Sequence, residues 1–148
     1  ARKSIENATD REGAYRFLRR LWAFAAQQEQ AVKLALEAQL SGIAARVDWG
    51  RANAAQKDAR REVHLNLRQA NYDFAKYQFN TVASAAMKIL NALDRFAGGR
   101  NEVTEEGLSI LLRLLSPITP HVCHHLWREL GFGEDILHAP WPEPLGGA

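Results

Sequence analysis

Cysteine is scarce in this sequence: the 148 residues include a single one, Cys123. One thiol cannot form an internal disulfide, so packing and hydrogen bonds have to hold the fold. The lone thiol agrees with a reducing compartment, and we expect a cytoplasmic protein. Long hydrophobic runs are lacking as well. No stretch approaches the ~20 apolar residues that span a bilayer, and the charged residues 1–4 are not followed by the apolar segment of a secretory signal. We therefore expect no membrane partner.

Recognisable catalytic patterns are also lacking. The sequence contains no Gly-x-Ser-x-Gly turn to present a nucleophilic serine, and no carboxylate pair that stands out for acid–base work. Gly98 and Gly99 are not followed by the Lys-Ser/Thr pair of a phosphate-binding loop. We expect neither a catalytic residue nor a bound cofactor in this chain.

The composition is that of a globular protein, with 47% hydrophobic and 24% charged residues. The net charge of +2 is unevenly placed. Residues 1–74 hold thirteen Lys/Arg against nine Asp/Glu, and residues 75–148 hold six against eight. The basic first half could face a phosphate backbone. The base composition of the genome can also favour arginine and produce the same bias, so amino-acid composition alone leaves both explanations open.

Helical periodicity dominates the first half of the chain. Apolar residues recur at helical spacing over 10–30, and a second helical piece over 31–39 could continue the first with a bend. Gly42 and residues 47–50 break the pattern. A third helix is expected over 52–74, where Val63, Leu67, Ala70 and Phe74 share one face.

Three further helices are expected in the second half. One runs over 80–96, with Asn80 as its expected cap and with inward-facing residues Val82, Ala83, Ala86, Ile89, Leu90 and Leu93. The next begins with Thr104 as N-cap and has Glu105 and Glu106 in its first turn, where the helix dipole favours acids. Its core stripe is Leu108, Leu111, Leu112 and Leu115, and Ser116-Pro117 ends it.

The last helix has Thr119 as cap and Pro120 at its first position, and it ends at Gly131. The proline-rich residues 139–148 cannot be helical and are expected to leave toward a further, missing C-terminal domain. The sequence therefore predicts an all-α bundle of about five to six helices, with residues 1–148 as a single domain.

A cluster of metal-binding residue types lies at 121–125. His121 and His125 are four residues apart, so their imidazoles could meet one ion, but zinc takes about four ligands and a helix turns Cys123 away from that pair. No glutamate follows the first histidine, as a zinc-protease helix would require. We expect a packed helix and no metal.

Basic side chains provide the candidate nucleic-acid contacts. On the third expected helix they recur opposite the apolar stripe, and others cluster on the first helix. Such a ridge could follow a phosphate backbone, which arginine suits better than lysine. The alternative is a solvated face paired with acids. The candidates are Arg16, Arg19, Arg20, Lys57, Arg60, Arg61, His64 and Arg68. Trp22, Tyr72, Tyr77 and Phe79 could stack on bases, although aromatics at helical spacing more often belong to the core.

Three stretches carry a family resemblance. Residues 13–22 (Gly-Ala-Tyr-Arg-Phe-Leu-Arg-Arg-Leu-Trp) are similar to the opening of the helical domain of bacterial leucyl-tRNA synthetases, and 60–64 with 79–82 resemble its central helix pair. Residues 115–127 (Leu-Ser-Pro-Ile-Thr-Pro-His-Val-Cys, ending in Leu-Trp), followed by Ala-Pro-Trp-Pro at 139–142, resemble its last helix and exit. The resemblance covers about residues 13–144, in order.

The resemblance implies a class I aminoacyl-tRNA synthetase, of which this chain would be only the anticodon-binding-type helical domain. The parent would ligate leucine to its tRNA with ATP and Mg²⁺. The family's His-Ile-Gly-His and Lys-Met-Ser-Lys-Ser signatures and its editing domain are absent from this sequence. The implied partners are leucine-specific tRNA and the catalytic domain of the same parent chain, with the fragment itself monomeric and catalytically inactive.

Three alternatives remain open on the sequence. The chain could be the equivalent domain of a valyl, isoleucyl or methionyl synthetase, which share a related helical domain. It could be a docking module that packs on the catalytic body, with Trp22 and Trp141 as exposed apolar patches. The least favoured is a stand-alone helical enzyme or metal protein, which rests only on the His/Cys cluster.

Overall fold

The computed structural model describes residues 2–40, 53–76, 79–95 and 102–144, and all of the regular structure in those ranges is helical. Five α-helices follow in order: α1 (Arg2–Leu40), α2 (Ala54–Ala75), α3 (Phe79–Arg95), α4 (Glu102–Leu115) and α5 (Pro120–Leu130). A short 3-10 helix, η2 (Ile136–His138), comes after α5. The predicted all-α bundle is confirmed.

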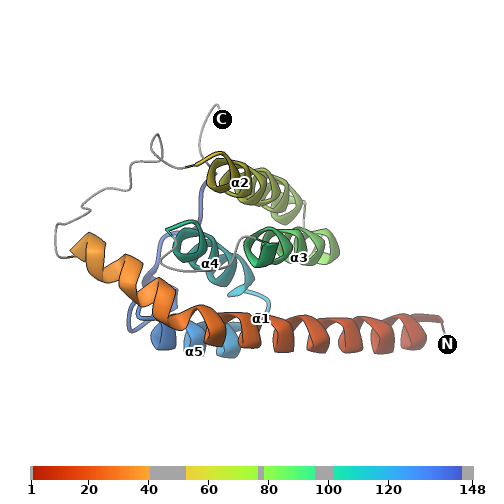
Figure 1. The fold of residues 1–148 in the computed structure, drawn as a ribbon. Coiled ribbons are helices and arrows are strands. Elements are labelled where there is room, and N and C mark those ends of the chain that lie inside the picture. The colour runs from red at the N-terminus through yellow and green to blue at the C-terminus, as the bar shows by residue number, and fades with distance from the viewer. Residues whose placement is uncertain (1, 41–52, 77–78, 96–101, 145–148) are drawn as a thin grey trace.

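The most apolar of the five helices, α4, is the centre of the bundle and contacts each of the other four helices. In Figure 1, α2 and α3 lie side by side on one side of α4, while α1 and α5 lie on the other side. Nine of the fourteen residues of α4 are buried, including the predicted stripe of Leu108, Leu111, Leu112 and Leu115. A helix that is apolar on most faces is stable only when other elements surround it.

The first helix is longer than periodicity predicts. The two expected pieces, 10–30 and 31–39, form one helix that starts at Arg2 and bends in its second half (Figure 1). Its first turns project beyond the other helices. Residues 2–12 carry few apolar side chains, so no hydrophobic stripe revealed this part of the helix.

Two predicted caps are wrong. The fourth expected helix begins at Phe79, so Asn80 lies inside α3. Thr104 lies inside the first turn of α4, which starts at Glu102, and it is buried. Ala83 is exposed and Ala85 takes its place in the core. Gly98-Gly99, Gly42 and residues 47–50 lie outside the described residues.

The cap of α2 is one that the sequence analysis missed. The side chain of Asn53 accepts a hydrogen bond from the backbone N–H of Gln56 at 2.8 Å, and the Gln56 amide oxygen accepts from the N–H of Asn53 at 3.1 Å. This reciprocal pair satisfies two of the N–H groups that a helix start leaves unpaired.

The ends of α5 confirm the prediction for the last helix. Thr119 precedes Pro120 at the first position, although the threonine side chain makes no cap hydrogen bond. Gly131 ends the helix in the left-handed region, with φ of 89°. Its N–H donates to the carbonyl of Arg128 at 3.1 Å.

Replacing Gly131 by alanine is expected to lower the free energy of unfolding by about 1 kcal/mol, because an L side chain is strained at this positive φ. Gly13→Ala is the matched control. A methyl group at Gly13 meets nothing within 4 Å, so it should raise the free energy of unfolding by about 0.5–1 kcal/mol through better helix propensity. Urea unfolding of both variants measures the difference, and two equal effects would contradict this account.

The predicted non-helical tail is confirmed for residues 139–144, but it folds back on the bundle. The indole Nε1 of Trp141 donates to the side-chain oxygen of Asn71 at 2.8 Å, and the Asn71 amide donates to the Pro142 carbonyl at 3.2 Å. Arg113 donates to the Pro140 carbonyl at 3.0 Å, and Phe74 meets Trp141 edge to face. These contacts hold residues 140–142 of the tail against α2 and α4.

Candidate nucleic-acid interface

The outward face of α2 carries a stripe of exposed side chains, most of which are cations. Lys57, Arg61 and Arg68 are all exposed, as the sequence predicted. Leu65, Tyr72 and Lys76 continue the same face and are exposed too. At 100° per residue these six side chains fall within an arc of roughly 100° around the helix. We call these six residues the α2 outer stripe.

One cation of the outer stripe, Arg61, forms an exposed ion pair. Arg61 pairs with Asp58 at 3.6 Å, and both side chains are about 70% exposed. Glu62, beside the stripe, pairs with Arg95 of α3 at 2.6 Å. Pairs this exposed are worth little, so a phosphate could replace the carboxylate partner of Arg61 at little expense.

Arg60 and His64 do not belong to this surface. Arg60 donates from Nε and Nη2 to the two carboxylate oxygens of Glu106 on α4, both at 3.0 Å. His64 is buried and its Nε2 lies 2.5 Å from Oε1 of the same carboxylate. His64 therefore does not lie on the exposed face with Lys57, Arg61 and Arg68, because α4 covers that flank of the helix.

The shared carboxylate is held in its ionised form. Burial by itself would raise the pKa of Glu106, but the hydrogen bonds and positive charges of His64 and Arg60 outweigh burial and lower the pKa below its usual value. An ionised carboxylate can only accept, so Nε2 of His64 carries the proton that it donates. The cluster of Arg60, His64 and Glu106 joins α2 to α4.

The arginines of α1 lie apart from the α2 outer stripe. Arg16 and Arg19 are exposed, and the Arg19 guanidinium lies 5.7 Å from the centre of the Tyr15 ring. Arg20 turns toward α3, where it donates to Asn91 at 2.5 Å and pairs with Asp94 at 3.3 Å. Figure 1 shows α3 and α4 between α1 and α2. The eight candidate residues therefore do not form one ridge.

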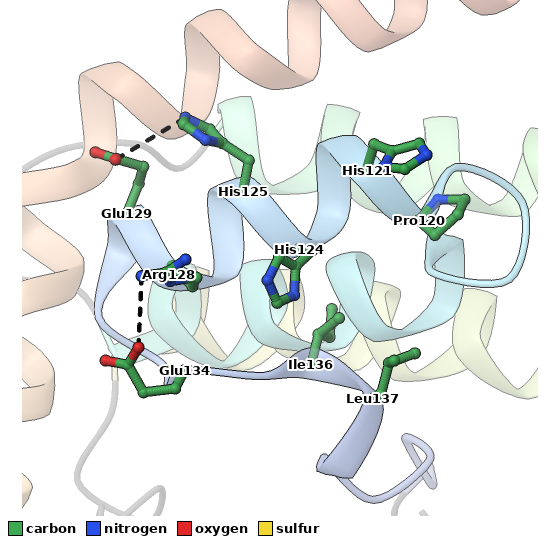
Figure 2. A pocket seen from close by; sticks show the side chains of 9 residues that line it. All are labelled: Pro120, His121, His124, His125, Arg128, Glu129, Glu134, Ile136 and Leu137. Carbon is green, nitrogen blue, oxygen red and sulfur yellow. Dashed lines mark ion pairs between the residues drawn. The ribbon is translucent and has the colours of Figure 1, made fainter.

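The histidines of α5 point in different directions. In Figure 2, His124 points toward Ile136 and Leu137 of η2, whereas His125 points toward Glu129 and lies 3.9 Å from its carboxylate. These residues, with His121, line a surface cavity of about 660 Å³. Within the described ranges, no three His, Cys, Asp or Glu side chains gather closely enough to hold a metal ion.

Cys123, the cysteine of the same segment, faces the core. It is fully buried, and burial raises the pKa of its thiol to about 12. The thiolate form that binds metals is therefore strongly disfavoured here.

The aromatic candidates divide in the same way. Trp22 is 44% exposed and its ring stacks on His125, with centroids 4.8 Å apart. Tyr72 is 57% exposed, and the Lys76 ammonium lies 4.3 Å from its ring centre. Tyr77 and the side chain of Phe79 lie outside the described residues. In the part of the chain that the structure describes, no helix is both long enough and apolar enough to cross a membrane.

A family model described as the anticodon-binding domain of tRNA ligase matches residues 56–146, which include most of α2, all of α3 to α5 and the tail of residues 139–144. The chain belongs to this family. The match covers the α2 outer stripe and the Arg60–His64–Glu106 cluster, but α1 precedes it.

Curated relatives of this anticodon-binding domain are leucine–tRNA ligases. One from Azoarcus sp. (strain BH72) is 56% identical over 141 residues, and one from Aromatoleum aromaticum is 55% identical over 139 residues. A third, from Coxiella burnetii, is 48% identical over 136 residues. The alignments cover 90–93% of this chain but only 15–16% of the relatives, so the chain spans about a sixth of their length. The resemblance to leucyl-tRNA synthetases is confirmed.

Proposed function

We propose that this anticodon-binding domain binds tRNA as part of a leucine–tRNA ligase, and that the α2 outer stripe contacts the tRNA phosphates. The observation that carries the proposal is the run of exposed cations on one face of α2, inside the segment that matches the family. Charge-assisted hydrogen bonds from such side chains position a protein on nucleic acid.

The name of the relatives supports a proposal for the activity of the longer chain. We infer that the longer chain ligates leucine to leucine-specific tRNA in the cytoplasm, with ATP and Mg²⁺ bound outside this domain. In this reading Lys57, Arg61 and Arg68 hold the tRNA body while other parts of the ligase carry out the reaction. Arg16 and Arg19 are separate candidates on α1, and Arg60 and His64 support the fold of α2. The domain itself is proposed to be monomeric.

The proposal predicts a salt-dependent affinity for tRNA. The double variant Lys57→Gln/Arg61→Gln should weaken tRNA binding and make the slope of log K against log salt shallower by roughly 2, since each neutralised phosphate releases a counterion. The matched double variant Arg16→Gln/Arg19→Gln removes two exposed cations from α1 and should change the slope less. Fluorescence anisotropy with labelled leucine tRNA measures both slopes. Salt is varied between about 50 and 200 mM, the range over which phosphate contacts change the affinity strongly.

Two results would contradict the proposal. The first is that the unmodified chain has no affinity for tRNA at low salt. The second is that the α1 variant loses as much slope as the α2 variant, which would move the contact to the other side of the bundle.

A second candidate function is docking onto the rest of the ligase. One observation favours it: a small cleft between α1 and α5, of about 110 Å³, is lined by the half-exposed Trp22 together with His125 and Leu130. An apolar surface that has lost its partner promotes self-association. Sedimentation velocity should then show concentration-dependent dimers that disappear in Trp22→Ala, and a strictly monomeric chain would count against this candidate.

A further inference from the structure

Tyr72 is an exposed aromatic residue inside a row of cations. It lies on the last full turn of α2, one turn after Arg68 and one turn before Lys76. Its side chain is 57% exposed, and the Lys76 ammonium lies 4.3 Å from the centre of the ring. A tyrosine of this kind contributes little to the core, because most of its apolar surface stays in contact with water.

The arrangement suits one class of ligand in particular. Unpaired nucleobases stack on aromatic side chains, and stacking tolerates any base because every base has a flat apolar face. The cation over the ring is attracted to the ring's electron-rich face, and cations beside a stacking ring neutralise the phosphates of the same strand. Paired bases in a duplex are already stacked on one another, so they are not free to bind the ring.

We propose that Tyr72 is a stacking platform for one unpaired base of the bound tRNA, with Lys76 and Arg68 beside the phosphates of that nucleotide. The inference rests on the proposed function, because it assumes that the α2 outer stripe faces tRNA. The inference adds a defined contact to the proposed function. At the Tyr72 end of the stripe the domain would bind a single-stranded segment of the tRNA and contact a base as well as the backbone.

The chain holds a built-in comparison. Tyr15 and Arg19 on α1 form a second tyrosine–cation pair with the same spacing of four residues, and Tyr15 is 63% exposed. The two pairs differ in their surroundings. Tyr72 continues the α2 outer stripe, whereas Tyr15 lies on α1, across α3 and α4. Tyr15→Ala therefore removes an equivalent exposed ring away from the proposed contact.

The test compares leucine tRNA with two short probes, an oligouridylate and an abasic oligonucleotide with the same number of phosphates. Tyr72→Ala should weaken binding of tRNA and oligouridylate roughly 5- to 150-fold, the range expected for one stacked base, and leave binding of the abasic probe unchanged. Tyr72→Phe keeps the ring and should retain affinity. Lys76→Gln should instead reduce the salt slope by about one on every probe. Tyr15→Ala should change none of these values.

Three outcomes would overturn the stacking platform while the proposed function stands: tRNA binding unaffected by Tyr72→Ala, an equal loss on the abasic probe, or an equal loss in Tyr72→Phe. Absence of any tRNA binding by the unmodified chain would instead overturn the proposed function. Circular dichroism of each variant separates a lost contact from a lost fold, and the exposure of Tyr72 favours an unchanged helix content.

Discussion

Replacing Glu106 by alanine is expected to lower the free energy of unfolding by about 3 kcal/mol. The substitution leaves the Arg60 guanidinium and the buried His64 without the acceptor that both share at present. A cation among packed helices that loses its carboxylate partner is costly, whereas the intact pair is close to neutral. The loss of stability therefore measures mainly the cost of burying Arg60 and His64 without the carboxylate, and only to a small extent the strength of the ion pair itself. Urea unfolding followed by circular dichroism measures it.

Glu62→Ala is the matched control for this prediction. Glu62 also pairs with an arginine of another helix, Arg95, at 2.6 Å, but the two side chains are 42% and 65% exposed. Water can solvate whichever partner remains, so the expected loss is only about 0.2–1 kcal/mol. If the two alanine variants were equally destabilised, burial would not be what makes the Glu106 cluster matter.

The same cluster predicts how stability depends on pH. The pKa of Glu106 is lowered in the folded protein from the ordinary 4.5, so the unfolded chain takes up this proton first as the pH falls. The carboxylate's contribution is therefore complete above the ordinary glutamate pKa and is lost as the pH drops through the folded value. Urea midpoints at pH 7, 5, 4 and 3 should fall more steeply in the unmodified chain than in Glu106→Ala. Parallel curves would contradict the lowered pKa.

Leu93 and Gly107 are expected to behave as one packing unit. A methyl group built on Gly107 would lie 2.8 Å from one terminal carbon of Leu93 and still closer to the other. Leu93 is fully buried, so it has little room to move. Gly107→Ala should therefore cost about 1–3 kcal/mol through overpacking, despite the better helix propensity of alanine. Leu93→Ala should cost about 2–5 kcal/mol because it leaves a cavity.

The double variant tests the contact directly. In Leu93→Ala/Gly107→Ala the added methyl group enters the space that the leucine vacates, so the combined loss should be smaller than the sum of the two single losses. Denaturant unfolding of the four proteins completes the cycle. Additive losses would contradict the close contact between Leu93 of α3 and Gly107 of α4. The close contact with Leu93 also explains why α4 carries a glycine, Gly107, in its interior.

The fold class could be predicted well from the sequence, because it depends on local periodicity. The leucines of 108–115 recur at helical spacing, and all four of those predicted to be inside are buried. Pro120 and Gly131 mark the ends of α5 through backbone preferences that act within a few residues. Caps were harder to predict, since several polar residues compete at each helix start. Asn80 and Thr104 are both residue types that cap helices, but they lie inside their helices.

The candidate site was predicted only in part, for a physical reason that His64 illustrates. Lys57 and His64 are seven residues apart, nearly two full turns, so periodicity assigns both to one helix face. Lys57 is exposed and His64 is buried, because α4 and its Glu106 cover the edge of that face on which His64 lies. Which side chains a distant helix covers is a long-range property, and spacing along one helix cannot report it.

Residue types and their local order were enough to predict the helical fold class and the family, and to show that recognisable catalytic patterns are lacking. The tertiary structure alone decided which basic residues face solvent and which are bound to Glu106. It separated the arginines of α1 from the α2 outer stripe, and it folded the proline-rich tail back onto Asn71. These outcomes depend on how the helices pack around α4, which brings together residues that lie up to about half the chain apart.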